Sequence, residues 1–437
     1  MFAVTSGVAN GDGQRREIVR IAGSSPLCYF LPSVGSFSSP KSRLRKFRGR
    51  SPFLGWVLIQ VMICGCGGSV PETITLGDDG RYHIHPGDNI QAVLDAAAAD
   101  PLNKQVIIHS GTYRPQYPAQ AMVRFHRRHD GIVLSGRGEV ILTAENEELA
   151  NRDLDSFPAI VNHVVYFGDG LSERTVLEGV RITGARGFTT DSEPDGPIEP
   201  ASDDPRLRKG LFFYLDGGGI KIFGRSYPTV RRVQVVGNQT RLCGGGISIE
   251  HRGFNDRSVR IVDSVFLENA CPATGPAIDL LEGSSVVIEN CLFVGNIGNT
   301  GMKEVAAQFG LVYNPKHGSG ALTVFPGSRA EVRRCTFTRN WNGVDDRGQG
   351  NRYRQCIFYM NDAGDGSLPG LPYELDIMDG SGVTDCWVQG TIDDLQGTVD
   401  PLRNSLDAPD PQFDSRFRPG NPLYRGIGYR RTDDPLP

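Results

Sequence analysis

The 437-residue sequence lacks several features that would place it in familiar functional classes. It has no excess of basic residues, because 46 Lys and Arg stand against 50 Asp and Glu, and this balance argues against nucleic acid as a partner. It has no apolar run of the roughly 20 residues that a membrane-spanning helix needs. It also has no CxxC pair of the kind that holds structural zinc.

What the sequence does contain is a short repeat, found seven times between Leu177 and Val388. Each copy has an apolar residue, two further residues, a small or apolar residue, one more residue and then a bulky apolar residue, and in five copies an asparagine follows three residues later. Self-similarity of this kind predicts a solenoid of stacked repeats. The copies are Leu177-Val180-Ile182, Val230-Val233-Val235, Ile261-Ser264-Phe266, Ile288-Cys291-Phe293, Val332-Cys335-Phe337, Tyr353-Cys356-Phe358 and Val383-Cys386-Val388, and the asparagines are Asn238, Asn269, Asn296, Asn340 and Asn361.

Each repeat is predicted to hold three strands. A glycine-led alternating strand comes first, a second strand ends at the small-residue column, and a third carries the bulky residue and the asparagine. The shortest repeat, from Cys335 to Cys356, is 21 residues long and leaves room only for three strands and three tight turns. The predicted glycine-led strands are Gly217–Phe223, Gly244–Glu250, Pro276–Leu281, Gly320–Phe325 and Gly343–Asp346.

Six of the nine cysteines lie in the repeat region, and four of them share the small-residue column. Those four are predicted to be buried free thiols that behave as small hydrophobic residues, and the asparagines are predicted to stack along the turns. Cys243 and Cys271 lie in turns of adjacent repeats and are the one pair whose position is compatible with a disulfide bond.

The N-terminal region reads as an export signal. A basic cluster between Lys41 and Arg50 precedes a short apolar run, which is the layout of a secretory signal. Ile63-Cys64-Gly65-Cys66 resembles the lipobox of bacterial lipoproteins, which implies lipidation at Cys66 and a membrane-anchored protein in the periplasm or at the cell surface. A plain signal peptide or an uncleaved anchor is the alternative. The predicted organisation is a leader over residues 1–65, a linker over 66–81 and one domain over 82–437.

The start of that domain resembles a known family. Ile90–Ala99 is predicted to be a helix, with Asp88 or Asn89 as its N-cap and Pro101 beyond its end. The helix, an apolar strand and Gly-Thr-Tyr-x-Pro from Gly111 resemble the opening of the pectate-lyase-like superfamily. The resemblance implies an all-β fold, a right-handed parallel β-helix with three strands per turn and an N-terminal capping helix. It also implies that the segment from Asp410 to Leu423 closes the last repeat.

The predicted functional face is that of the glycine-led strands. The two long insertions, Ala185–Asp216 and Ile297–Ser319, fall in the same turn and are expected to rise beside this face, which marks it as the binding side. Alternation directs one row of side chains out into a groove: Lys221, Ser248, Asp279, Thr323 and Asp345. The candidate catalytic residues are Lys221, Glu250, Asp279 and Asp345, and the candidate substrate-binding residues are Phe223, His251, Arg252, Phe325 and Arg347.

These residues are consistent with cleavage of an acidic extracellular polysaccharide by lyase or hydrolase chemistry. A Ca²⁺ held by carboxylates would neutralise the sugar acid, and a basic side chain would take the C5 proton. The Gly-His-Gly and Arg-Ile-Lys segments of polygalacturonase-type hydrolases and the Trp-x-Asp-His segment of pectate lyases are absent. The alternatives are a non-catalytic module that binds glycan or protein and a purely structural solenoid, in which Lys221 and Asp279 form a surface ion pair of about 0–1 kcal/mol. A monomer with a glycan partner and a lipid anchor is expected.

Overall fold

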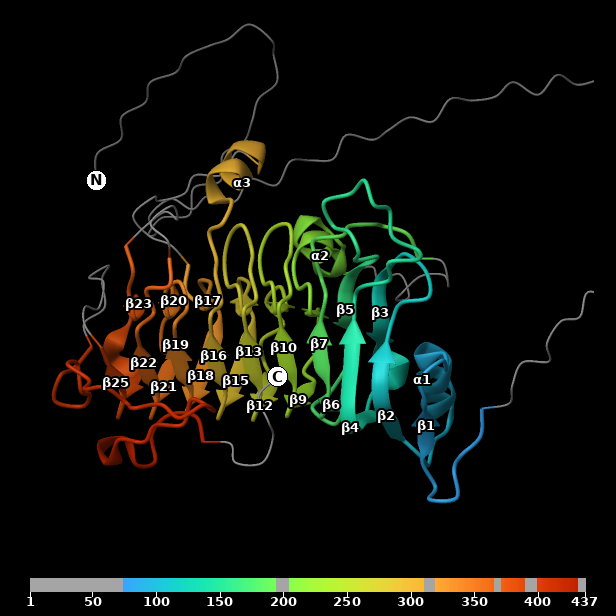
Figure 1. Cartoon of the computed structure of the whole chain (residues 1–437), viewed down its shortest axis with the longest axis horizontal. Coiled ribbons are helices and arrows are strands. Elements are labelled where there is room, and N and C mark those ends of the chain that lie inside the picture. Colours follow the sequence, from blue (N-terminus) through green and yellow to red (C-terminus); the bar gives the residue numbers. More distant parts are fainter. Residues whose placement is uncertain (1–73, 194–203, 310–318, 365–370, 390–398, 431–437) are drawn as a thin grey trace, which may run out of the picture.

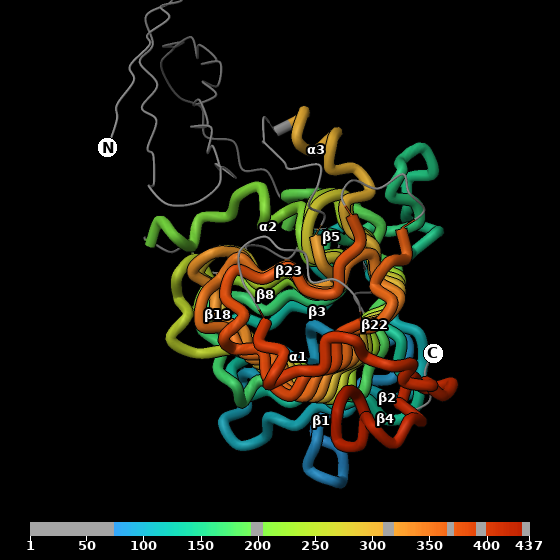
Figure 2. Tube along the Cα trace, turned by 90° about the vertical axis from the view of Figure 1, so that its left-hand side faces the viewer, coloured from blue at the N-terminus to red at the C-terminus, as the bar shows by residue number. Residues whose placement is uncertain are grey.

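The computed structural model describes residues 74–193, 204–309, 319–364, 371–389 and 399–430, and it is built predominantly from parallel β-strands (Figure 1). The strands form one sheet of 17 strands and one of eight. Seen along the long axis, successive repeats overlie one another (Figure 2). Three α-helices accompany the described strands: α1 (Ile90–Ala99), α2 (Leu211–Leu215) and α3 (Met302–Phe309).

The eight-stranded sheet contains the glycine-led strands. The five predicted ones are present, each beginning one to three residues later than expected, and three others without a leading glycine were missed. The strands are β3 (Ala119–Phe125), β5 (Val161–Phe167), β8 (Ile220–Phe223), β11 (Ile247–Glu250), β14 (Ile278–Leu280), β17 (Leu322–Val324), β20 (Val344–Asp346) and β23 (Leu375–Ile377).

The 17-stranded sheet consists of two series of parallel pairings, which the long strand β4 joins because it pairs with both β6 and β7. The first series contains β1 (Tyr82–Ile84), β2 (Gln105–Tyr113), β4 (Val133–Thr143), β6 (Val176–Glu178), β9 (Thr229–Arg231), β12 (Val259–Val262), β15 (Ser285–Glu289), β18 (Arg329–Arg333), β21 (Arg352–Arg354) and β24 (Val383–Thr384). The second contains β7 (Arg181–Thr183), β10 (Gln234–Val236), β13 (Val265–Leu267), β16 (Leu292–Val294), β19 (Thr336–Thr338), β22 (Ile357–Tyr359) and β25 (Trp387–Val388).

The bulky column of the repeat forms a stack of phenylalanines in the core. The ring centroids of Phe266 and Phe293 are 4.8 Å apart, those of Phe293 and Phe337 4.2 Å, and those of Phe337 and Phe358 5.1 Å. The four cysteines of the small-residue column are fully buried and free, as predicted. Equivalent residues therefore stack on one another because each repeat pairs in register with the next.

Glycine leads the strands of the eight-stranded sheet because the backbone of the next repeat comes too close for a side chain. A Cβ added at Gly245 would lie 2.3 Å from the carbonyl oxygen of Ala270, well inside contact distance. Gly244 has φ +63°, a conformation that favours glycine. The leading glycines therefore reflect close backbone packing between repeats, and they do not indicate a catalytic or binding function.

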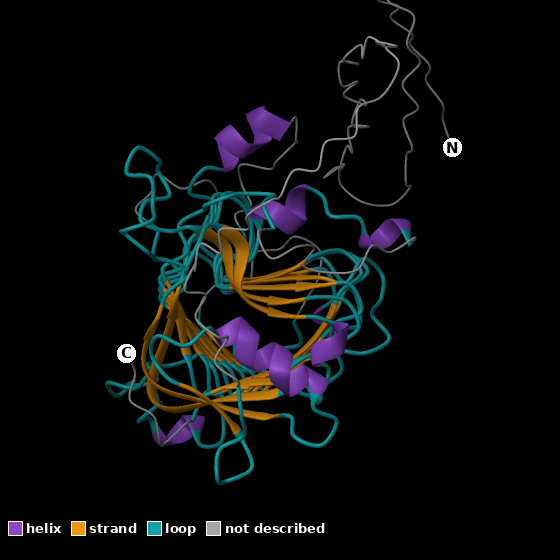
Figure 3. Ribbon diagram, turned by 90° about the vertical axis from the view of Figure 1, so that its right-hand side faces the viewer, coloured by secondary structure: helices purple, strands orange, loops and turns teal. Residues whose placement is uncertain are grey.

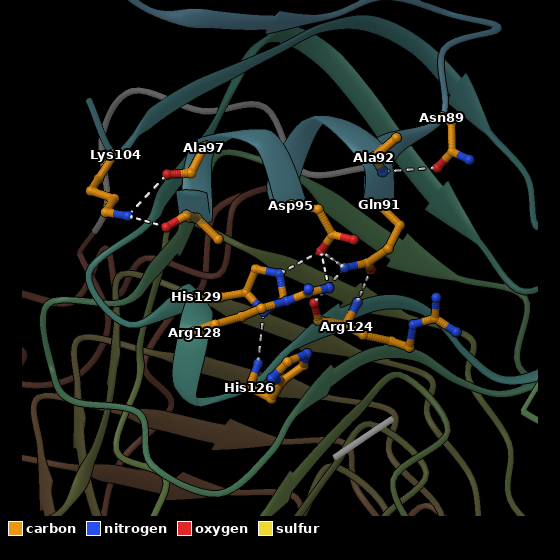
Figure 4. A network of polar contacts seen from close by, with 11 residues as sticks. Asn89, Gln91, Ala92, Asp95, Ala97, Lys104, Arg124, His126, Arg128 and His129 are labelled. Atoms are coloured by element: carbon orange, nitrogen blue, oxygen red, sulfur yellow. Dashed lines mark hydrogen bonds and ion pairs between the residues drawn. The ribbon is translucent and has the colours of Figure 1, made fainter. Parts of the chain in front are cut away.

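Helix α1 covers the N-terminal end of the stack, as the sequence predicted (Figure 3). Asn89 is its N-cap and accepts a hydrogen bond from Ala92 N at 3.1 Å, while Ile90, Val93 and Leu94 are buried against the first strands. At the other end, Lys104 Nζ donates to the carbonyl oxygens of two of the last helical residues (Figure 4). Both helix termini thus find partners for groups that the helix itself leaves unpaired.

Asp95 on α1 links this helix to the short 3-10 turn Arg127–His129 (Figure 4). Its Oδ1 accepts hydrogen bonds from His129 Nε2 at 2.8 Å and Gln91 Nε2 at 3.1 Å, and Arg128 lies 2.6 Å away. Burial acts to raise the pKa of Asp95, but these hydrogen bonds and the arginine charge together hold it below the ordinary value of 3.8. The carboxylate therefore stabilises the folded chain only while it is ionised.

Replacing Asp95 with Asn is expected to lower the free energy of unfolding by about 1 kcal/mol at pH 7, because the ion pair is partly exposed and screened by solvent. Since the folded pKa is depressed, this contribution is present above about pH 4 and is lost as the pH falls through the folded value. Urea denaturation at pH 7 and pH 3 measures the difference. The exposed Asp153→Asn variant is the control, and an Asp95→Asn deficit that persists unchanged at pH 3 would contradict the assignment.

The C-terminal segment corrects one prediction. It does not simply close the last repeat, because residues 408–430 run back along the outer face of the second series of strands. Tyr424 packs against Trp387 near the last repeat, whereas Tyr429 packs against Leu292, and Arg430 N donates to Asn290 Oδ1 at 2.9 Å. The reason is that several outward residues of this series are apolar and need a cover.

Candidate functional site

Six polar side chains lie in register along the outer face of the eight-stranded sheet, one from each of β8, β11, β14, β17, β20 and β23. Neighbouring members are about 4.8 Å apart, the spacing of paired strands. The predicted order of the first five is confirmed, and the sixth was missed because β23 has no leading glycine. We name this set the polar row: Lys221, Ser248, Asp279, Thr323, Asp345 and Asp376.

The expectation that this row lines an open groove is wrong. Lys221 and Asp279 have no exposed surface and Asp345 is 7% exposed. Helix α2, which belongs to the first insertion, lies over the Lys221 end of the row, where the carbonyl oxygen of Phe212 accepts a hydrogen bond from Lys221 Nζ at 2.9 Å. Helices α2 and α3 of the two insertions do lie on the predicted side (Figure 1), but the apolar residues of α2 pack down onto the sheet.

Lys221 is fully engaged in the structure. Its ammonium lies 2.8 Å from Glu250 Oε2 and donates to Ser248 Oγ at 3.1 Å. Glu250 also pairs with Arg252, whose Nε donates to Oε1 at 2.7 Å. The predicted lysine and glutamate therefore meet, but as a buried pair with a second cation and not as a free base beside a groove.

The other end of the row is organised by an arginine. Arg347 Nε lies 2.8 Å from Asp345 Oδ1, and its Nη2 lies 3.5 Å from Asp376 Oδ2. The two neighbouring carboxylates raise the pKa of the guanidinium, so this group stays charged. Because Arg347 pairs with both carboxylates and occupies the space between them, this part of the row does not fit the Ca²⁺ site expected from the sequence.

Three predicted substrate-binding residues are buried. His251 has no exposed surface, its Nε2 contacts Ser226 O at 2.9 Å, and its Nδ1 accepts from Ser285 N at 3.2 Å. Burial lowers the pKa of His251 to about 4, so the ring is neutral and braces two turns. Phe223 lies under α2 and Phe325 is 7% exposed.

Arg252 and Arg347 are the two predicted substrate-binding residues that keep substantial exposed surface, with side chains 27% and 26% exposed. The sequence predicted that Phe223, His251 and Phe325 would be exposed in a groove, and their burial contradicts that prediction. Contact of any of the five with substrate stays a prediction.

A second cluster of polar residues shares Asp279 with the polar row. One ligand atom each from Asp216, Cys243 and Asp279 lies within 4.8 Å of the others, and all three residues are buried. Burial raises the pKa of Asp279 to about 8, although the Thr274 hydroxyl and the Lys221 ammonium act to lower it. Burial also raises the pKa values of Asp216 and of the Cys243 thiol well above their ordinary values. The sequence did not identify this cluster, because its members come from three separate turns and strands.

Cys243 and Cys271, the one pair whose position was compatible with a disulfide bond, are both free thiols in the structure. Cys243 Sγ instead accepts from the Thr274 hydroxyl at 3.1 Å, and Cys271 Sγ donates to the Thr274 carbonyl at 3.2 Å. Thr274 therefore supplies a hydrogen-bond partner to each of the two sulfur atoms.

The exposed charge of the stack lies on a different face, formed by the first series of strands. Eight arginines are exposed there, against five acidic residues in a chain whose formal net charge is −4. Reasoning from the glycine-led strands missed this face, although the alternation in Arg329–Arg333 and Arg352–Arg354 signals it. We name it the arginine face: Arg231, Arg232, Arg260, Arg329, Arg333, Arg334, Arg352 and Arg354, with Glu178, Asp263, Glu289, Glu331 and Asp385 among them.

Some of these arginines are paired and others are not. Glu289 pairs with Arg333 and Arg334, Glu178 with Arg231 and Arg232, and Asp385 with Arg354. Within the described parts of the chain, no ion pair is found for three exposed guanidinium groups. These are Arg260, Arg329 and Arg352.

The leader and Cys66 lie outside the described residues. In the part of the chain that the structure describes, no helix is long and apolar enough to cross a membrane. Comparison with protein-family models, with curated proteins and with solved structures finds no match.

Proposed function

We propose that this chain is an exported, right-handed parallel β-helix with three strands per turn, and that its arginine face binds an acidic extracellular polysaccharide. The single observation that carries the binding proposal is the set of eight exposed arginines on β9, β12, β18 and β21 and in the turns that follow β9 and β18. The parallel pairing of β8, β9 and β10 with the equivalent strands of the next repeat supports the β-helix. The leader and lipidation at Cys66 would place the protein at the outside of a cell.

Guanidinium groups suit an acidic sugar because they bind carboxylates through two parallel hydrogen bonds. On the arginine face they recur along the stack. Arg260 and Arg352 occupy the same register position three strands apart, with Val287 and Glu331 between them. Repeating cations along a straight face match a polymer that repeats an acidic unit, whereas a compact ligand would contact one strand or two.

Binding to a polyuronate and to a neutral glucan of similar length tests the proposal by titration at low and high salt. The full chain is expected to bind the polyuronate and not the neutral glucan, with affinity falling as salt rises. The Arg260→Ser/Arg352→Ser double variant is expected to bind at least 10-fold more weakly, because each guanidinium has no described ion pair to lose. Arg425→Ser, an exposed arginine of the C-terminal segment, is the matched control. Equal affinity for both polymers, or an unchanged double variant, would contradict the proposal.

Cleavage of the polysaccharide at the polar row is the second candidate function. The favouring observation is that Asp279 stays protonated up to about pH 8 beside the Lys221–Glu250 ion pair, as a general acid requires. Lys221, Glu250, Asp279 and Asp345 would then act only after α2 moves off the sheet. Ultraviolet absorbance during the same titrations would rise if β-elimination produced an unsaturated sugar, and that result would favour this second function.

A further inference from the structure

The cluster of Asp216, Cys243 and Asp279 lies where three separate segments converge. Asp216 ends the first insertion, Cys243 lies in the turn before β11, and Asp279 is the outward residue of β14. The exposed fraction is 1% for Asp216, 4% for Cys243 and 0% for Asp279. The fold therefore holds two carboxyl groups and a thiol together away from solvent.

Several of these polar atoms lack hydrogen-bond partners. Among the described residues, none donates a hydrogen bond of good geometry to Asp279 Oδ1, Asp279 Oδ2 or Asp216 Oδ2. Asp216 Oδ1 does have one, because Cys243 N donates to it at 3.0 Å. Buried carboxylate oxygens are rarely left unpaired, because burial removes their hydrogen bonds to water. Unpaired oxygens on two carboxyl groups that each bring a ligand atom to within 4.8 Å of the other and of Cys243 therefore point to a missing partner with positive charge.

We propose that Asp216, Cys243 and Asp279 bind one divalent transition-metal ion, with Zn²⁺ as the best match. Two carboxylate oxygens and one thiolate form a mixed donor set that zinc accepts. Ca²⁺ and Mg²⁺ prefer oxygen ligands alone, and a thiolate excludes them. The site goes beyond polysaccharide binding, because it lies beside α2 and α3 and not on the arginine face. A metal ion on Asp279 would exclude the general-acid role of this residue in the second candidate function.

The surroundings fit a buried site with three protein ligands, in which a water molecule would complete the four-coordinate shell of zinc. Leu242 and Ala273 beside Cys243, together with Met302 and Val305 of α3, form an apolar cluster against which Phe212 of α2 packs. Residues from both insertions therefore meet over the metal ligands. The bound ion would tie the end of the first insertion to the sheet and hold both helices against it.

Metal analysis of the full chain tests the site directly. The chain is purified without chelator, equilibrated with Zn²⁺ and freed of unbound ion, and is expected to retain one equivalent of zinc and to melt at a higher temperature than the chelator-treated chain. In Co²⁺ the thiolate is expected to give a sulfur-to-metal charge-transfer absorption band. Cys243→Ala and Asp279→Asn are expected to weaken zinc binding at least 100-fold, and Cys335→Ala, a buried cysteine of the small-residue column, is expected to leave it unchanged.

Each outcome decides the proposal. Retention of zinc by Cys243→Ala or Asp279→Asn would overturn it, as would tighter binding of Ca²⁺ than of Zn²⁺. Circular dichroism checks that each variant is folded. If a variant fails to fold, the Co²⁺ spectrum of the unaltered chain still decides, because the absence of a thiolate band shows that the cluster is three neutral groups without metal. Polysaccharide titration of the zinc-free chain separates this site from the arginine face, whose binding is expected to persist.

Discussion

Replacing Asn296 with alanine is expected to lower the free energy of unfolding by about 3–5 kcal/mol. Asn296 Oδ1 accepts hydrogen bonds from Asn269 N at 3.1 Å and from Asn269 Nδ2 at 3.0 Å. Its Nδ2 donates to Phe266 O at 3.0 Å and to Asn340 Oδ1 at 2.8 Å. A fifth bond runs from Nδ2 to Val294 O at 3.2 Å. Alanine removes all five, and the groups it leaves unpaired are buried.

The size of this effect follows from the way the asparagines are linked. We name the five the asparagine ladder. Asn269, Asn296, Asn340 and Asn361 each accept from the backbone and the side chain of the asparagine in the preceding repeat, and the first donor is Asn238. All five have no exposed surface or almost none. Each buried donor or acceptor left unpaired costs about 1–3 kcal/mol, and two or three such groups give the expected total.

Urea denaturation at pH 7 measures the loss, with Asn255→Ala as the matched control. Asn255 makes one exposed hydrogen bond, to Gly327 O at 3.1 Å, so its removal is expected to change stability by less than about 1 kcal/mol. A loss below about 1 kcal/mol for Asn296→Ala would show that the asparagine ladder is not a source of stability.

The sequence was sufficient to predict what repetition determines. The spacing of Cys291, Cys335 and Cys356 placed these residues in one column, and the alternation around Lys221 and Asp279 placed both in one row, since a one-residue slip would turn every side chain to the other face. The capping helix could be predicted equally well from the sequence, because its N-cap and its apolar face are local signals.

What repetition does not determine was predicted poorly. The insertions have no periodicity, so nothing in Ala185–Asp216 indicated that α2 would fold down onto Phe223 and cover Lys221. The C-terminal segment was likewise read from a resemblance to closing segments, whereas its course depends on which outward residues of β13, β16 and β22 are apolar. Both outcomes depend on contacts between distant parts of the chain.

The two charged regions of the stack differ in a way that bears on function. The polar row is buried, and the charged groups at its two ends are paired, Lys221 with Glu250 and Asp345 with Arg347. The arginine face is exposed to solvent on β9, β12, β18 and β21. Exposed charge meets a polymer from solution without rearrangement, and for that reason binding at the arginine face ranks above cleavage at the polar row.

The C-terminal end of the asparagine ladder gives the second large expected effect. There Asn361 meets a carboxyl group, because Asn361 N donates to Glu374 Oε1 at 3.1 Å and Asn361 Nδ2 donates to Glu374 Oε2. Glu374 is 7% exposed. Burial raises its pKa to about 7; the hydrogen bonds from Asn361 lower it in part, and the charge of Asp362 adds to the increase.

The sign of the resulting pH dependence follows from the raised pKa. A folded value of about 7 against an ordinary value of 4.5 means that the contribution of Glu374 is fully present below about pH 4.5. It is lost as the pH rises through about 7, because the folded chain must then hold an ionised, buried carboxylate. The loss amounts to about 3 kcal/mol by pH 9, at about 1.4 kcal/mol per pH unit.

Glu374→Gln is therefore expected to reverse its effect with pH. At pH 5 the variant is expected to be about 1 kcal/mol less stable than the unaltered chain, since glutamine offers one acceptor to the two donors of Asn361. At pH 9 it is expected to be about 2 kcal/mol more stable, because it carries no charge to bury. Urea denaturation at pH 5, 7 and 9 shows where the stability of the variant overtakes that of the unaltered chain. The exposed Glu331→Gln variant on β18 is the control. Parallel stability curves for Glu374→Gln and the unaltered chain would mean that the ladder ends on a carboxylate that water reaches.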